Sequence, residues 1–187
     1  YVRRGYANRV RMLDSNNWAT IPVSANFGPF SEVEISRREA TAQVGRRIRH
    51  WSSERQYPYG ARLQPIIDRL LQSDDQLLHT LNVDLIKLII EALDHTKTEI
   101  VIDMRTWTKT NAAETIIKLV SGHGDTYLSG VGGLKYLARQ ELSDIETVKV
   151  QHLDASIGPE SVLHYIAREE DPAAVLKTIG EWRIWDL

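Results

Sequence analysis

The chain has 187 residues, of which 42% are hydrophobic and 26% are charged, and its formal net charge is −2. This composition excludes a disordered chain, and the length suits a single domain with a sizeable core. No apolar run approaches the ~20 residues of a membrane-spanning helix, and the start of the chain does not look like a signal peptide, so no membrane partner is expected. Cysteine is absent, which excludes disulfides and cysteine-ligated metals and fits a cytoplasmic location.

Charge is distributed unevenly along the chain. Residues 1–60 contain ten arginines and no lysine against five acids, whereas the rest of the chain carries more acids than bases. A one-sided basic segment indicates an anionic partner, and the planar guanidinium group of arginine binds phosphate and carboxylate oxygens in pairs. A solvated basic face with local ion pairs is the alternative interpretation.

The first part of the chain is predicted to be extended. Residues 6–13 alternate weakly and residues 18–23 are strand-like, with a turn cluster of Asp, Ser and Asn between them. Residues 31–36 alternate Val and Ile with Glu, which is typical of a half-buried strand. We therefore expect a hairpin-like β segment followed by a further strand.

The middle of the chain is predicted to be all helical. Residues 37–55 repeat apolar side chains at helical spacing and end at a Tyr-Pro-Tyr-Gly segment. Two further helices are expected over residues 61–72 and from 76 to about 94. The polar residues 73–75 are expected to cap the second of them.

Strands and helices alternate from residue 99 onward. Residues 99–103 contain a short apolar run of the buried-strand kind, and strands are also expected near 126–129 and 147–153. Helices are predicted over residues 112–121, 134–141 and 159–169 and from 172 onward, the last packed on the core by Trp182 and Trp185. The alternation predicts an α/β fold with a mostly parallel sheet flanked by helices, as one domain over residues 1–187.

The loop after the strand at 99–103 is a candidate site. Asp103 stands at the strand end, and Arg105, Thr106, Trp107 and Thr108 follow it. Ligands of open parallel sheets bind at the carboxyl ends of the strands, where this set could grip phosphate oxygens and stack a ring on the tryptophan. The alternative is an exposed connection in which the threonines only cap and turn.

The glycine-rich turn at residues 130–133 gives a weaker signal. Glycines there would let the backbone approach an anion at the start of the following helix. The pattern is neither the dinucleotide-binding fingerprint nor the P-loop, and a tight turn needs no ligand.

His123 is the best candidate for proton transfer among the six histidines, because it lies near Asp125 and precedes the glycine-rich turn. Asp103 is the other candidate acid or base. No pair of histidines has the spacing of a helical zinc site, so no metal site is expected, and the sequence identifies no cofactor.

Two motifs carry a resemblance to a known family. Residues 1–11 combine basic and aromatic side chains with the pair Asn8-Arg9, and a Trp-x-Thr-x-Pro-Val segment follows at 18–23. The second motif is Tyr-Leu-Ser-Gly at 127–130. With these motifs the sequence resembles the WbqC-like family.

The resemblance implies an α/β protein of surface-polysaccharide biosynthesis, a transferase acting on nucleotide-activated sugars or amino-acid-like groups. The substrate-binding residues that it implies are Arg4, Asn8, Arg9, Tyr127, Ser129 and Gly130. The family usually begins with a strand and a Gln-Pro-x-Tyr-x-Pro segment, which does not precede Tyr1 here. The family's Ser-x-x-Asp helix is also altered, to Ser161-Val162-Leu163-His164. If the missing segment holds a catalytic group, the chain as given lacks part of its site.

Three functions follow as hypotheses. The first is a transferase on a phosphorylated or nucleotide-activated small molecule, with the anionic substrate clamped by arginines. The second is a phage-type enzyme that transfers an amino acid or similar group to a modified base in DNA, with Arg46, Arg47 and Arg49 contacting the nucleic acid. The third is a non-catalytic component of a biosynthetic complex.

Overall fold

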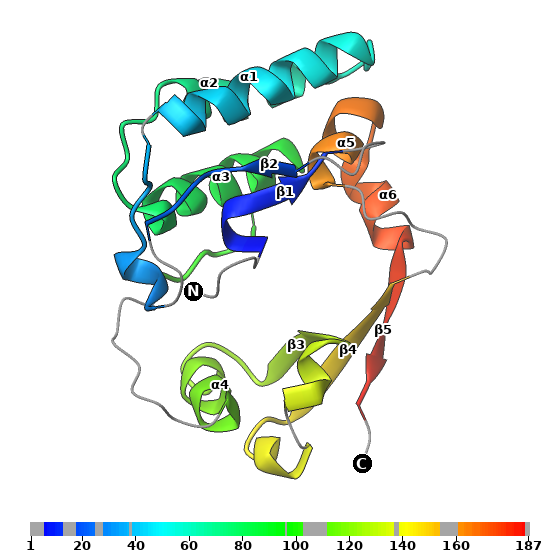
Figure 1. Ribbon diagram of the computed structural model, residues 1–187. Coiled ribbons are helices and arrows are strands. Elements are labelled where there is room, and N and C mark those ends of the chain that lie inside the picture. The colour runs from blue at the N-terminus through cyan, green and yellow to red at the C-terminus, as the bar shows by residue number, and fades with distance from the viewer. Residues whose placement is uncertain are drawn as a thin grey trace. The chain divides into compact units, whose positions relative to one another are not determined.

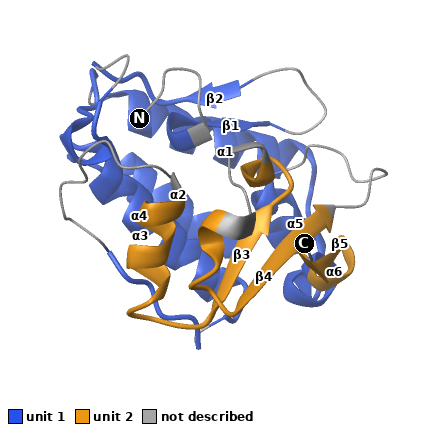
Figure 2. Cartoon of the chain, turned by 90° about the horizontal axis from the view of Figure 1, so that it is seen from below, with its two compact units in different colours: residues 1–102, 158–176 blue, residues 103–157, 177–187 orange. Residues whose placement is uncertain are grey.

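The computed structural model describes residues 6–12, 18–24, 28–37, 39–95, 97–102, 112–136, 139–153 and 161–185 (Figure 1). The chain forms two compact units (Figure 2). Unit 1 comprises residues 1–102 and 158–176, and unit 2 comprises residues 103–157 and 177–187. Each unit has its own cluster of buried apolar side chains.

Unit 1 begins with the predicted hairpin. A 3-10 helix, Tyr6–Asn8, leads into β1 (Arg9–Arg11), which pairs antiparallel with β2 (Trp18–Thr20). Ala19 faces the core of the unit and is buried, as is Ile21 just beyond β2. The hairpin therefore forms one wall of the unit.

The predicted strand at residues 31–36 is wrong. Phe30–Glu32 forms a 3-10 helix, and the following residues make only isolated bridges, Val23 to Ile35 and Glu34 to Leu77. The alternation of Val33 and Ile35 still reflects burial on one side, because Val33 is fully buried. An alternation of apolar and polar residues indicates which side chains are buried. A strand also needs a neighbouring strand that pairs with it along its length.

The helical middle section is confirmed, and two short helices from the end of the chain complete the helical part of the fold. These helices are α1 (Glu39–Glu54), α2 (Gln64–Leu71), α3 (Leu78–Ala92), α5 (Val162–Arg168) and α6 (Pro172–Thr178). The short 3-10 helix Gly60–Leu63 leads into α2. The core of unit 1 consists of the apolar faces of α1, α2, α3 and α5 together with the hairpin.

The contact between α1 and α2 depends on a glycine. A Cβ atom placed on Gly45 would lie 3.1 Å from Leu70 Cβ and 3.2 Å from the Ile67 carbonyl oxygen. Glycine costs about 1 kcal/mol of helix propensity relative to alanine, so its presence inside α1 indicates a packing reason. The two helices approach closely because this position has no side chain.

Arg69 links α2 to α3 and to the segment between them. Its guanidinium group donates to Asp84 at 2.8 and 3.0 Å and to Asp75 at 2.6 Å. Partial burial acts to lower the pKa of Arg69, but the hydrogen bonds to Asp84 and Asp75 outweigh it and raise the pKa. The predicted capping of the third helix by residues 73–75 is wrong, since Leu77 occupies the cap position without a side-chain hydrogen bond and Asp75 binds Arg69 instead.

Replacing Arg69 with methionine is expected to lower the free energy of unfolding by about 1–2 kcal/mol, because two carboxylates lose their shared cation in a partly buried place. Urea unfolding checks this, and the loss should shrink in high salt. The matched control is Lys118→Met, since Lys118 forms an exposed i,i+4 pair with Glu114 worth only about 0.3–0.5 kcal/mol. Equal losses in the two variants would contradict the expectation.

Unit 2 contains the three-stranded sheet. Its elements are α4 (Ala112–Val120), β3 (Thr126–Gly130), β4 (Thr147–Leu153) and β5 (Gly180–Ile184). The strand order is β3-β4-β5, with β3 parallel to β4 and β5 antiparallel to β4. The α/β fold class is thus confirmed, with a mixed sheet that contains one parallel pair.

Three sequence predictions around unit 2 are corrected. Residues 99–102 form no strand, and Val101 and Ile102 are about half exposed, because a short apolar run without a paired neighbour does not suffice for a strand. Residues 134–141 do not form an α-helix: the described residues there lie in the 3-10 helices Gly133–Tyr136 and Arg139–Leu142. Trp182 does not pack the last helix, since it lies in β5 and is half exposed.

Within the described residues, no helix combines the length and the apolar composition needed to cross a membrane.

Candidate functional site

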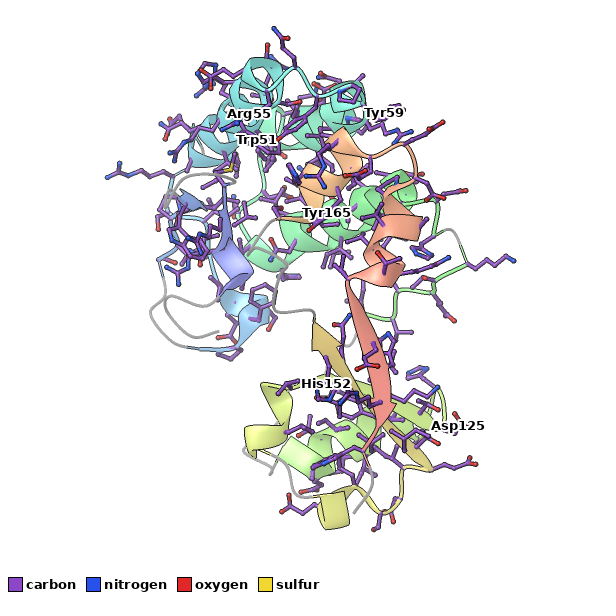
Figure 3. The ribbon with its side chains drawn as sticks, turned by 90° about the vertical axis from the view of Figure 1, so that its right-hand side faces the viewer. Trp51, Arg55, Tyr59, Asp125, His152 and Tyr165 are labelled. Atoms are coloured by element: carbon purple, nitrogen blue, oxygen red, sulfur yellow. The ribbon has the colours of Figure 1, made fainter. Side chains whose placement is uncertain are left out.

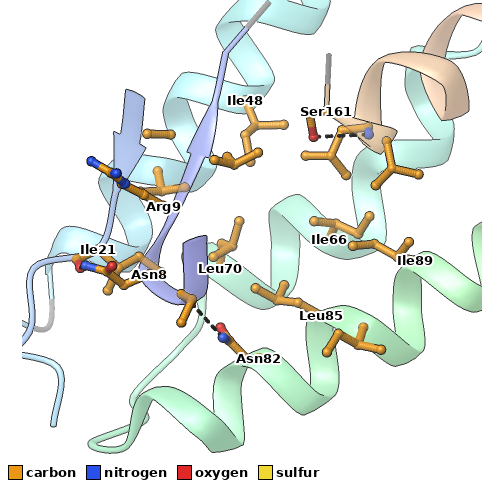
Figure 4. Close-up of a pocket in the computed structure, with 17 residues that line it drawn as sticks. Asn8, Arg9, Ile21, Ile48, Ile66, Leu70, Asn82, Leu85, Ile89 and Ser161 are labelled. Carbon is orange, nitrogen blue, oxygen red and sulfur yellow. Dashed lines mark hydrogen bonds between the residues drawn. The ribbon is translucent and has the colours of Figure 1, made fainter. Parts of the chain in front are cut away.

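Unit 1 contains a cavity of about 330 Å³ beside the hairpin (Figure 4). Its wall is mostly apolar, with four polar residues, Asn8, Arg9, Asn82 and Ser161. The remaining lining residues are Ala7, Val10, Ala19, Ile21, Val44, Ile48, Ile66, Leu70, Leu85, Ile86, Ile89, Val162 and Leu163. A largely apolar cavity with a few polar groups is the usual form of a small-molecule site.

Two asparagine side chains fix the segment that enters the cavity wall. Asn8 Nδ2 donates to the carbonyl oxygen of Ile21 at 2.8 Å, and the amide nitrogen of Ile21 donates back to the carbonyl of Asn8. Asn82, on α3, donates from its Nδ2 to the carbonyl of Ala7 at 2.7 Å. The backbone before β1 is therefore held from two sides, and this positions Arg9 at the cavity.

Arg9 is the charged residue of the cavity lining, and its guanidinium group lies on the face of the hairpin opposite to the core-facing Val10 and Ala19. Its guanidinium carbon lies 4.4 Å from the ring centroid of Trp18 on the neighbouring strand, a cation–π distance. Arg47, on α1, donates to the carbonyl oxygen of Trp18 at 3.2 Å. Among the described residues that line the cavity, Arg9 is the one that carries a charge.

A buried histidine holds α5, whose first turn lines the cavity. His164 is 5% exposed, its Nδ1 lies 2.9 Å from Tyr57 Oη and its Nε2 lies 2.7 Å from Arg168 Nη1. Rings of Trp51 and Tyr165 complete the cluster (Figure 3). Ser161 caps the helix, because its Oγ accepts from the Leu163 amide at 3.3 Å. The altered Ser-x-x-Asp segment thus has a structural role here.

The second predicted set lies on β3 in unit 2. Ser129 is 5% exposed, and its Oγ donates to the Gly130 carbonyl at 3.1 Å. A Cβ atom on Gly133 would lie 2.5 Å from this hydroxyl, so the glycine makes room for the serine. Tyr127 packs against the core of unit 2. Of the three predicted residues, only Gly130 is exposed.

His123 and the glycine-rich turn lie at opposite ends of β3. His123 and Asp125 precede the strand, and Gly130 ends it, about 13 Å from Thr126 at 3.3 Å per residue. Figure 3 labels Asp125 at this amino end and His152 toward the far end of β4. The structure therefore does not bring His123 to a ligand held at the turn.

The remaining predicted site residues, Arg4, Asp103, Arg105, Thr106, Trp107 and Thr108, lie outside the described residues. The predicted loop site is therefore not described. Within the described part of the chain, no group of three or more His, Asp or Glu side chains could hold a metal ion.

A family model for the WbqC-like protein family matches residues 1–160. The chain belongs to the WbqC-like protein family. No curated protein and no solved structure matches it. The matched range of this WbqC-like chain includes both motifs of the sequence, and Asn8-Arg9 of the first motif lines the cavity.

The sequence did not reveal Asn82 and Ser161 as cavity residues of this WbqC-like protein. Asn82 lies inside α3, and Ser161 is the N-cap residue of α5. Polar residues at such positions are common on protein surfaces, so the sequence around them does not indicate a cavity. The signal that could have found Ser161 is its place in the altered Ser-x-x-Asp segment.

Proposed function

We propose that the chain is a transferase acting on a phosphorylated or nucleotide-activated small molecule, as in surface-polysaccharide biosynthesis. Membership of the WbqC-like family supports a biosynthetic enzyme. The observation that carries the proposal is the place of Arg9, a residue of the family motif, in the wall of a mostly apolar cavity. The Arg9 guanidinium group lies over Trp18, on the face of the hairpin opposite to Val10 and Ala19, so it would bind phosphate or carboxylate oxygens of a part of the ligand that lies outside the apolar wall.

The size of the cavity favours one part of such a substrate. A volume of about 330 Å³ is at the lower end of the range of small-molecule sites, roughly 300–1,000 Å³. It suits a single ring or short chain, so a nucleotide attached to that group would extend beyond the cavity. Asp103 and His123 stay the proposed acid and base, and Arg105, Thr106, Trp107 and Thr108 proposed substrate-binding residues; all six belong to unit 2, and they are proposed independently of the cavity in unit 1.

The described arginines favour this function over the DNA-modifying alternative. Arg47 donates to the Trp18 carbonyl and Arg49 lies 3.7 Å from Asp68, so two of the three arginines proposed for DNA contact each have a protein partner. Arg46 is exposed on α1. Turnover by the isolated protein would exclude a non-catalytic component.

Isothermal titration with a panel of nucleotide sugars and sugar phosphates tests the proposal. At least one compound should bind, and Arg9→Met should weaken its binding about 10-fold or more, because a charge-assisted hydrogen bond is lost. Arg46→Met is the matched control and should bind as the unchanged protein does. Failure of every compound to bind, or an equal effect of both variants, would argue against the proposal.

A further inference from the structure

The sheet of unit 2 ends in an edge strand, β5, whose outer side pairs with no other strand among the described residues (Figure 1). We infer that this edge binds β5 of a second copy of the chain, antiparallel and centred on Trp182, so that the protein forms a symmetric dimer. The dimer is independent of the proposed function and does not involve the cavity. The backbone, the apolar side chains and the charges of β5 each support it.

The pairing with β4 determines which backbone groups lie on the outer edge of β5. The Trp185 amide, just beyond β5, donates to the Val148 carbonyl at 2.8 Å, so these two residues form a hydrogen-bonded pair of the antiparallel ladder. Such pairs alternate along a ladder, and every second residue of β5 therefore directs its backbone N–H and C=O groups outward. The outward-directed residues are Gly180, Trp182 and Ile184.

The side chains of β5 leave this edge open to another strand. Trp182 and Ile184 are 48% and 61% exposed and lie on the same face of the sheet. Edge strands are commonly protected by a proline, a lysine or a bulge, and β5 has none of these. Pairing with a second β5 would place two Trp182 side chains opposite each other, and a cross-strand aromatic pair is favourable.

The charges of β5 select one register. When the pairing is centred on Trp182, Glu181 of each copy lies opposite Arg183 of the other, and the two-fold symmetry forms this pair twice. A shift by two residues places either Glu181 opposite Glu181 or Arg183 opposite Arg183, and like charges directly opposite each other are destabilising. A shift by one residue mismatches the backbone groups of the two edges. Within one chain the two side chains form an exposed ion pair, so each is already oriented along this edge strand.

Sedimentation velocity over a range of protein concentrations tests the dimer. One short strand from each copy makes an interface smaller than the roughly 1,000 Å² of a stable assembly, so we expect a dissociation constant of about 10–100 µM. The chain should therefore convert from monomer to dimer between about 1 µM and 1 mM. A chain that stays monomeric over this range would overturn the inference, and so would a continuous series of larger oligomers, because the symmetric pairing closes at two copies.

Charge reversals locate the interface on β5. Glu181→Arg and Arg183→Glu should each weaken the dimer about 10-fold or more, because two attractive cross-strand pairs become repulsive. Glu99→Arg, the same change at an exposed residue of unit 1, is the matched control and should leave the dissociation constant unchanged.

An equimolar mixture of the two β5 variants separates pairing between copies from damage within one chain. Every charged side chain at positions 181 and 183 of one variant then faces an opposite charge on the other, so the mixture should dimerise at least as tightly as the unchanged chain. The ion pair within each chain stays broken in the mixture, and only contact between copies can restore the dimer. A mixture no tighter than either variant alone would overturn the inference, as would Glu181→Arg dimerising as tightly as the Glu99→Arg control.

Discussion

Replacing Gly45 with valine is expected to lower the free energy of unfolding by about 3 kcal/mol. The change forces α1 away from α2, because a Cβ atom alone would already lie 3.1 Å from Leu70 Cβ and 3.3 Å from Leu71 Cγ. Two further methyl groups cannot enter this contact without moving a helix. Urea unfolding followed by circular dichroism measures the loss.

Two comparisons separate crowding from a general effect of the substitution. Gly45→Ala gains helix propensity and requires a shift of only a few tenths of an ångström, so its loss should be much smaller. Gly122→Val adds the same side chain where nothing lies within 4 Å of the new Cβ, and it should change stability by less than about 0.5 kcal/mol. Similar losses for valine at both positions would show that α1 and α2 are not tightly packed at Gly45.

The same contact connects stability to ligand binding. Val44 and Ile48 of α1 and Ile66 and Leu70 of α2 all line the cavity. A displacement of α1 therefore changes the cavity wall as well as the core, and Gly45→Val should weaken the binding of a compound that the nucleotide-sugar titration identifies. Sequence pattern alone could not have linked these effects.

Local signals predicted the elements that depend on local sequence. The limits of β4 follow from the alternation of its apolar residues, and those of α1 follow nearly from the helical period of its apolar residues and from the Pro and Gly after it. Residues 31–36 and 99–102 have strand-like composition but no strand. Whether such a segment pairs depends on distant parts of the chain, and local composition does not contain that information.

The candidate site was predicted only in part for the same reason. Asn8 and Arg9 stand out because they belong to a motif, and they do line the cavity. Most of the rest of the wall comes from four helices and the hairpin, and its apolar residues look like ordinary core residues in sequence. The role of Asn8 in holding Ile21, thirteen residues away, becomes visible only in the structure.

The surroundings of His164 could not be inferred from the local sequence. The sequence presents it as an isolated helical histidine, whereas the structure buries it between Tyr57 and Arg168, residues from two different segments. A guanidinium group can only donate hydrogen bonds, so Nε2 of His164 is unprotonated where it faces Arg168. Nδ1 then carries the ring proton and donates to Tyr57 Oη.

Replacing His164 with alanine is expected to lower the free energy of unfolding by about 3–5 kcal/mol, since a buried ring and two hydrogen bonds are lost together. Tyr57 and Tyr165 would lose a ring whose centroid lies 5.2 and 5.6 Å from theirs. Arg168 would lose one of its acceptors and would keep its contact with Glu169. Urea unfolding provides the measurement, with His95→Ala, a change at an exposed histidine, as the control that should have little effect.

A second variant separates packing from hydrogen bonding. His164→Phe keeps a ring among the aromatic side chains but accepts nothing from Arg168, so its loss should be smaller than that of alanine and well above that of the control. Because the cavity residues Ser161 and Leu163 lie at the N-cap and in the first turn of α5, both variants should also weaken the binding of a compound that the nucleotide-sugar titration identifies. If His164→Ala is as stable as His95→Ala, the buried cluster does not hold α5, and its link to the cavity wall fails with it.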